Sequence, residues 1–134
     1  MKIQHVPAEW TVQTWPKVVH FLEDALAFSG DDYNIGQLQT MVNTGQLLLC
    51  VALDDAGFHG ACVVQMFNRP AKRIAFVVAI GGKLVSNKDT FRQFSELLKA
   101  FGATHIEGAA RESIARLWAR YGLVEKHRIV GAAL

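Results

Sequence analysis

The middle of the chain alternates between apolar runs and short polar turns. Three runs, Leu47–Leu53, Ala61–Phe67 and Arg73–Ile80, are apolar almost throughout, with Phe58–Gly60 as a candidate extension of the second. The segments between them are rich in Asp, Asn, Gly and Pro, which is the composition of tight turns. Consecutive strands joined by such turns form an antiparallel meander. Because these strands are apolar on both faces, we expect helices to cover both sides of the sheet.

Two stretches before the meander have the spacing of amphipathic helices. The first helix is predicted over Trp15–Phe28, with Thr14 as its N-cap and Gly30 as its end. The second is predicted over Asn34–Asn43. The short mixed segment Lys2–Val6 reads as an edge strand at the start of the chain.

Beyond the meander, the apolar positions return to helical spacing. A helix with an apolar stripe from Phe91 to Phe101 is predicted, capped by Ser86 or Asn87. The remaining elements are a short strand at Thr104–Glu107, a helix at Glu112–Tyr121 and a last strand at Leu123–Val130. The short strand should lie parallel to Arg73–Ile80, because a helix connects the two. The chain is therefore expected to form one α/β (α+β, three-layer) domain over residues 1–134, with a mixed central sheet.

Composition and charge exclude several classes of protein. With 134 residues, 51% hydrophobic and 19% charged, the chain has the composition of one folded domain and not of a disordered segment. A net charge of +2 argues against a broad basic face for nucleic acid. No apolar run approaches the roughly 20 residues of a membrane span, and no apolar leader follows Met1 and Lys2. These features predict a cytoplasmic protein with no nucleic-acid or membrane partner.

The two cysteines, Cys50 and Cys62, lie inside apolar runs and lack the spacing of a metal site, so no metal is expected. They are either buried reduced thiols or, if their strands pair in the right register, a disulfide. The last predicted strand and the segment Gly131–Leu134 fit a monomer, and they equally fit a homodimer in which they pair.

The order of elements, at this length, resembles the GCN5-related N-acetyltransferase (GNAT) superfamily. The best local match is the stretch AARESIARLWARYGL at residues 109–123. It is similar to the family segment that ends in Leu-Tyr, a few mixed residues and Gly-Phe. The resemblance implies a GNAT-like mixed central sheet with helices on both faces, and acetyl-CoA as cofactor. Short GNAT-like proteins of bacteriophages, including internal virion proteins, are a similar group, so a virion-associated location is the alternative to a cytoplasmic one.

The resemblance also implies where the cofactor lies. In the family, a bulged strand meets the pantetheine arm, and the following Arg/Gln-x-x-Gly-x-Gly/Ala turn holds the pyrophosphate at a helix start. The matching strand positions here are Val78, Ala79 and Ile80, and the matching turn residues are Gly81, Gly82, Lys83 and Lys88. The turn departs from the pattern, because its glycines come early and Asp89 adds a negative charge to the first helical turn. Weak or absent binding of acetyl-CoA is therefore predicted.

The implied catalytic positions are altered as well. The tyrosine that many family members use as general acid aligns with Trp118, whose indole cannot give up a proton at useful pH. Tyr121 is the remaining phenol for the leaving thiolate. His105 and Glu107 alternate on a predicted strand, so they share a face, and either side chain is a candidate to take the proton of an acceptor amine.

Two functions of different classes follow. The first is an acyl-CoA-dependent N-acetyltransferase-like protein with an altered cofactor loop and without the usual tyrosine. Its acceptor is an amine-bearing small molecule or protein. The alternative is a non-catalytic GNAT-fold protein that works by binding, such as a phage virion-associated protein.

Overall fold

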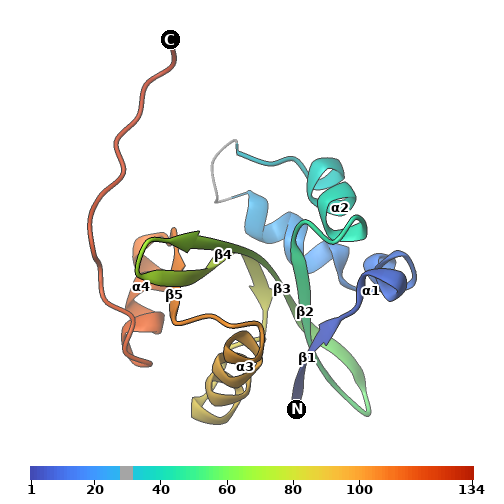
Figure 1. Ribbon diagram of the computed structural model, residues 1–134. Helices are drawn as coiled ribbons and strands as arrows, with labels where there is room; N and C mark the ends of the chain where they lie inside the picture. The colour runs from blue at the N-terminus through green and yellow to red at the C-terminus, as the bar shows by residue number, and fades with distance from the viewer. Residues whose placement is uncertain (28–31) are drawn as a thin grey trace.

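A computed structural model describes residues 1–27 and 32–134. The elements are, in order, β1 (Lys2–Val6), α1 (Ala8–Leu26), α2 (Ile35–Asn43), β2 (Leu48–Asp54), β3 (Gly57–Arg69), β4 (Lys72–Gly82), α3 (Lys88–Ala100), β5 (His105–Gly108) and α4 (Glu112–Ala119). They form a five-stranded mixed sheet with strand order β1-β2-β3-β4-β5 (Figure 1). The first three pairings are antiparallel, and β5 is parallel to β4. The predicted meander, the parallel strand and the fold class are confirmed.

The sheet separates two apolar cores, as expected for strands that are apolar on both faces. One core contains Trp15, Val18 and Leu22 of α1 with Leu38 and Val42 of α2. The other packs α3 and α4 onto the opposite face through Phe94, Leu98 and Trp118. Figure 1 shows α1 and α2 on one side of the sheet and α3 and α4 on the other. The three-layer arrangement of the sequence analysis is therefore correct.

The starts of the first three helices differ in how well the sequence predicted them. Asn87 caps α3 and Asn34 caps α2, each with a side-chain oxygen that accepts the N–H of the residue three positions on. The N-cap prediction for α1 is wrong, because the helix begins at Ala8 after Pro7 and continues through Pro16. Thr14 lies inside it, where its hydroxyl donates to the carbonyl oxygen of Trp10 at 3.0 Å. The predicted end at Phe28 and Gly30 lies outside the described residues.

The predicted last strand at Leu123–Val130 is wrong. Residues 123–134 belong to no helix or strand, and most of them are exposed. A strand needs a neighbour for its backbone groups, and none of the described elements pairs with this segment.

Cys50 and Cys62 lie directly opposite each other on β2 and β3, and both are buried free thiols. Burial raises the pKa of Cys50 to about 12 and holds that of Cys62 well above its ordinary range. Within the described residues no group of three His, Cys, Asp or Glu side chains could hold a metal ion. No helix in the same ranges is long and apolar enough to cross a membrane.

Candidate functional site

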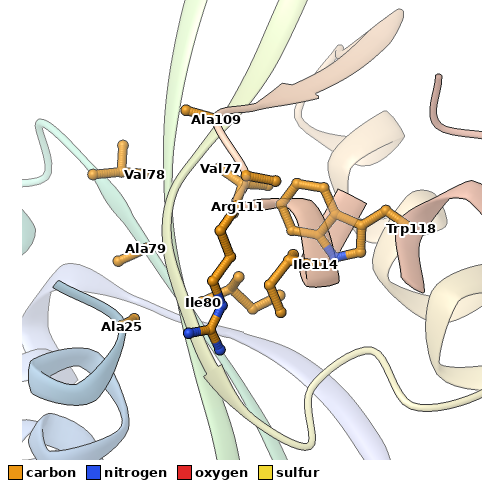
Figure 2. A pocket seen from close by; sticks show the side chains of 10 residues that line it. Ala25, Val77, Val78, Ala79, Ile80, Ala109, Arg111, Ile114 and Trp118 are labelled. Atoms are coloured by element: carbon orange, nitrogen blue, oxygen red, sulfur yellow. The ribbon is translucent and has the colours of Figure 1, made fainter. Parts of the chain in front are cut away.

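A cleft opens where β4 and β5 part. Residues Ile74–Val77 of β4 pair with residues His105–Gly108 of β5. Strand β5 ends at Gly108, whereas β4 continues to Gly82. The chain then turns through Ala109 and Ala110 into α4. The cleft is lined from β4 by Val77, Val78, Ala79 and Ile80, and from the other side by Ala109, Ala110, Arg111, Ile114 and Trp118, with Ala25 of α1 at one end (Figure 2).

A β-bulge in β4 lies at this cleft. Val63 of β3 pairs with Ala79 and Val64 pairs with Val77, so Val78 is an extra residue without a partner in β3. The bulge interrupts the alternation of the strand. Val78 and Ala79 both pack toward the core of α1 and α2, whereas Val77 contributes to the opposite core. Figure 2 shows the side chains of Val78 and Ala79 on the same side of β4. The backbone around Val78 is therefore partly released from the ladder, at the point where β5 has ended.

The turn glycines have a packing role. A Cβ on Gly81 would lie 2.8 Å from the carbonyl carbon of Phe21, and closer still to its oxygen. Gly82 has a φ of +69°, a conformation that side chains rarely adopt. The N–H of Lys83 then donates to the carbonyl oxygen of His59 at 2.8 Å. These glycines allow α1 to lie directly against the end of β4, so their presence is explained without a ligand.

Three backbone N–H groups at the start of α3 have partners within the loop. The N–H groups of Ser86 and Asn87 donate to the hydroxyl of Thr90, at 3.0 and 3.2 Å. The N–H of Thr90 in turn donates to the Asn87 side chain at 2.9 Å. These three amides are therefore not free to hold an anion at the helix start.

The charged residues of this turn are Asp89 and the two lysines Lys83 and Lys88. The Asp89 carboxylate accepts from Arg92 and Gln93, both at 2.8 Å, and these hydrogen bonds hold its pKa below the ordinary value. Lys83 and Lys88 are exposed. Of the seven predicted cofactor-binding residues, only Val78, Ala79 and Ile80 line the cleft.

Trp118 forms the floor of the cleft on the α4 side. It is 9% exposed. A Cβ on Gly108 would lie 2.9 Å from the Cζ3 atom of its indole, so the ring lies against the last residue of β5. The indole is therefore buried between α4 and the end of β5. Gly108 is what leaves room for the ring.

The three predicted acid-base residues lie in different environments. The Glu107 carboxylate accepts two hydrogen bonds from Arg69, at 2.6 and 2.8 Å, and one from Lys126 at 2.8 Å. Its side chain is only 11% exposed, and these two cations lower its pKa to about 2. His105 is exposed at the start of the same strand, with Nδ1 at 2.8 Å from the hydroxyl of Thr104.

Tyr121 is not at the cleft. Its ring stacks on Phe91 of α3 with a centroid distance of 5.1 Å and an interplanar angle of 19°. The structure therefore brings His105 and Glu107 onto one short strand but leaves Tyr121 with the core of α3. Sequence reasoning did not include Ala109 and Ala110 in the site. The signal was present, because two small residues between a strand and a helix leave space for a ligand.

The comparisons with known proteins agree with this geometry. No protein-family model matches the chain, and the search of curated proteins gives no significant match. Solved structures match along nearly the whole length. An aminoglycoside acetyltransferase from an uncultured soil metagenomic sample, crystallised with trehalose, has a TM-score of 0.69 at 10% identity, with 99% of this chain and 94% of that one covered.

Two further structures match over a similar share of the chain. A predicted acetyltransferase from Clostridium acetobutylicum, crystallised with acetyl-CoA, has a TM-score of 0.63 at 10% identity, over 98% of this chain and 95% of that one. A ribosomal-protein-alanine N-acetyltransferase from Brucella melitensis has a TM-score of 0.68 at 10% identity, with both chains covered completely. The chain thus shares the fold of these acetyltransferases. More specifically, it is the GNAT fold that the sequence resemblance implied.

Proposed function

We propose that the protein is an acetyltransferase-like protein whose cleft takes the acyl-thioester end of an acyl-CoA beside an acceptor amine. One observation carries this proposal. The parting of β4 and β5 coincides with the bulge at Val78, so backbone groups freed from the ladder line a cleft open to a ligand. That coincidence occurs in a chain whose fold is shared by acetyltransferases, one of them crystallised with acetyl-CoA.

Each predicted site residue takes a role that its surroundings allow. When bound, acetyl-CoA supplies the thioester that an acceptor amine attacks. The donors for the carbonyl oxygen, where charge develops in acyl transfer, are those backbone N–H groups of Val78 to Ile80 that point away from β3. The Glu107 carboxylate already accepts from Arg69 and Lys126, and its pKa of about 2 makes it a poor base, so its role is to hold these two cationic side chains beside β5.

Proton transfer then falls to the remaining side chains. His105, exposed on the same strand as Glu107, takes the proton of the acceptor amine. Tyr121 is the phenol for the leaving thiolate, and this role requires its ring to leave the stack on Phe91. Water is the alternative donor at that point. The acceptor is an amine-bearing small molecule or a protein.

The phosphate end of the cofactor fits less well than the thioester end. The amides of Ser86, Asn87 and Thr90 are used within the loop, and the Asp89 carboxylate lies in the first turn of α3. Lys83 and Lys88 are the cations left to contact phosphates. We therefore expect S-acetylpantetheine, which lacks the nucleotide, to bind within a few-fold of acetyl-CoA.

Calorimetric titration with both ligands tests this proposal. Ala110→Trp fills the cleft at an exposed position, and Ala71→Trp, in the exposed β3–β4 turn, is the matched control. A ligand at 100 times its Kd should also stabilise the folded state by about 2.7 kcal/mol. We expect binding by the native chain and the control, and none by Ala110→Trp. If neither ligand binds the native chain at millimolar concentration, the cleft is not an acyl-thioester site.

A non-catalytic binding function is the second candidate, and two specific observations favour it. The amides of Ser86 and Asn87 are used within the loop before α3, and the buried Trp118 stands where the resemblance places the usual tyrosine. In that case the protein works by binding, in the cytoplasm or as part of a phage particle. Acetyl transfer to a panel of polyamines, aminoglycosides and lysine peptides separates the two candidates, since only the first one predicts turnover.

A further inference from the structure

Among the residues that the structure describes, one side chain alone brings a charge to the cleft between β4 and β5. Ten described residues line this cleft, and nine of them are aliphatic or aromatic. The tenth is Arg111, the last residue before α4. Ligand sites are mostly apolar, and the few polar groups within them fix the orientation and the identity of the ligand. The choice of substrate should therefore depend on Arg111.

The side chain of Arg111 lies beside the strand that carries the bulge. Figure 2 shows it running along β4 from Val77 toward Ile80, and all three residues line the same cleft. Arg111 is exposed, so a ligand can reach it. Lys83 and Lys88, the cations assigned to the phosphates, are not among the lining residues that the structure describes. The guanidinium group therefore lies at the end of the cleft that the proposed function gives to the thioester and the acceptor.

The start of α4 adds to the positive potential on the same wall. Arg111 is the N-cap residue of this helix, and no described side chain caps the first amides. The helix start thus carries a partial positive charge next to the guanidinium group. Glu112 is the acidic residue of the first turn, but its side chain is 88% exposed and contacts Arg116 at 3.5 Å. Helical periodicity places this pair on the side of α4 away from Ile114, which lines the cleft.

We propose, building on the proposed function, that Arg111 binds a carboxylate of the substrate and so determines which substrate the cleft accepts. A guanidinium group presents a planar fork of five N–H donors that matches the two oxygens of a carboxylate. Five donors also allow it to hold a ligand together with other partners. The carboxylate belongs either to the acceptor, as in an amino acid, or to the acyl group, as in a succinyl thioester. Both sources place the same anion in an otherwise apolar cleft.

Two pairs of probes test the proposal and separate the two sources. N-acetyl-L-alanine and N-acetyl-L-alaninamide differ only in a carboxylate on the acceptor side. S-succinylpantetheine and its terminal amide differ in the same way in the acyl group. In calorimetric titration of the native chain, the acid of at least one pair should bind about tenfold more tightly than its amide, since hydrogen bonds to charged groups are strong. The pair that shows this preference identifies the source of the carboxylate.

Substitutions on α4 assign the preference to one side chain. Arg111→Gln removes the charge, so the acid and the amide should then bind equally. Arg111→Lys keeps the charge without the fork and should retain part of the preference. Arg116→Gln is the matched control, because it removes the same charge from an exposed position of the same helix and should leave the preference unchanged. The comparison of acid with amide on the native chain does not depend on how well any variant folds.

The outcomes also distinguish this proposal from the proposed function. If the native chain binds acid and amide equally in both pairs, or binds no probe at millimolar concentration, the proposal is overturned. A preference that survives Arg111→Gln overturns it as well. So does a loss of affinity for acetyl-CoA but not for S-acetylpantetheine in this variant, since the guanidinium group would then serve the phosphates. If the acids bind through Arg111 while neither acetyl-CoA nor S-acetylpantetheine binds, the carboxylate site stands and the acyl-thioester function fails.

Discussion

Replacing Gly81 by alanine tests whether the turn glycines serve packing or a ligand. The new Cβ would lie 2.8 Å from the carbonyl carbon of Phe21 and closer to its oxygen, which is nearer than real Cβ atoms come to backbone. Neither group is the flexible end of a side chain, so α1 or β4 must move. Overpacking of this kind costs about 1–3 kcal/mol. For a domain of this size, that lowers the melting temperature by about 4–12 °C.

Thermal and urea unfolding of the Gly81→Ala variant measure this loss. Gly131→Ala is the control, because nothing lies within 4 Å of the Cβ it would add. We expect the Gly81→Ala variant to lose stability in the absence of any ligand, and the control to unfold like the native protein. A Gly81→Ala variant that is as stable as the native protein but loses affinity for acetyl-CoA would refute the reasoning, since the glycine would then serve the ligand.

Substitutions at three further residues probe the site. Trp118→Ala should cost about 3–5 kcal/mol in urea unfolding, because the indole is buried, whereas Trp118→Tyr should fold and, if only the acid is missing, should gain acetyl transfer. The folded pKa of Glu107, about 2, lies below its ordinary value of 4.5, so its stabilisation is complete above pH 4.5 and is lost as the pH falls toward 2. The stability difference between native protein and Glu107→Gln should shrink over that window, and a constant difference would contradict the ion pairs with Arg69 and Lys126. Thr90→Ala removes the hydroxyl that accepts from two loop amides, so it should lower stability. If these hydrogen bonds keep the amides from phosphate, the variant should also bind acetyl-CoA more tightly relative to S-acetylpantetheine. An unchanged ratio of the two affinities would show that the hydrogen bonds within the loop do not limit binding.

The fold was largely predictable because its strands and helices have strong local patterns. The exceptions have physical causes that lie outside the local pattern. The predicted start at Trp15 put Pro16 in the first turn of the helix, where proline is tolerated. The helix instead begins at Ala8, and the packing of Trp15 and Val18 in the core beside the sheet holds α1 together through the proline. The segment Leu123–Val130 has the apolar content of a strand, yet a strand also needs a paired neighbour, which no described element of the chain supplies.

The candidate site was harder to predict, because its geometry depends on residues distant in the sequence. The bulge at Val78 arises from how β4 pairs with β3, and the β4 sequence by itself does not show it. The pKa of Glu107 depends on Arg69 and Lys126, which are 38 and 19 residues away. The loop before α3 was expected to hold phosphate weakly for lack of glycine. The structure adds a second reason, because Thr90 accepts hydrogen bonds from two amides of this loop. That these hydrogen bonds weaken phosphate binding is a prediction.

The facing pair Cys50 and Cys62 gives the protein a built-in reporter of its own dynamics. A thiol reacts as the thiolate, and burial keeps both groups protonated, with the pKa of Cys50 raised to about 12. Both side chains lie in the core that α3 and α4 cover, so a maleimide reaches them only during an opening that exposes this face of the sheet. The rate of modification under native conditions thus measures the free energy of that opening, as amide hydrogen exchange would. A ligand that binds in the cleft and disfavours this opening should lower the rate of maleimide modification without contacting either sulfur.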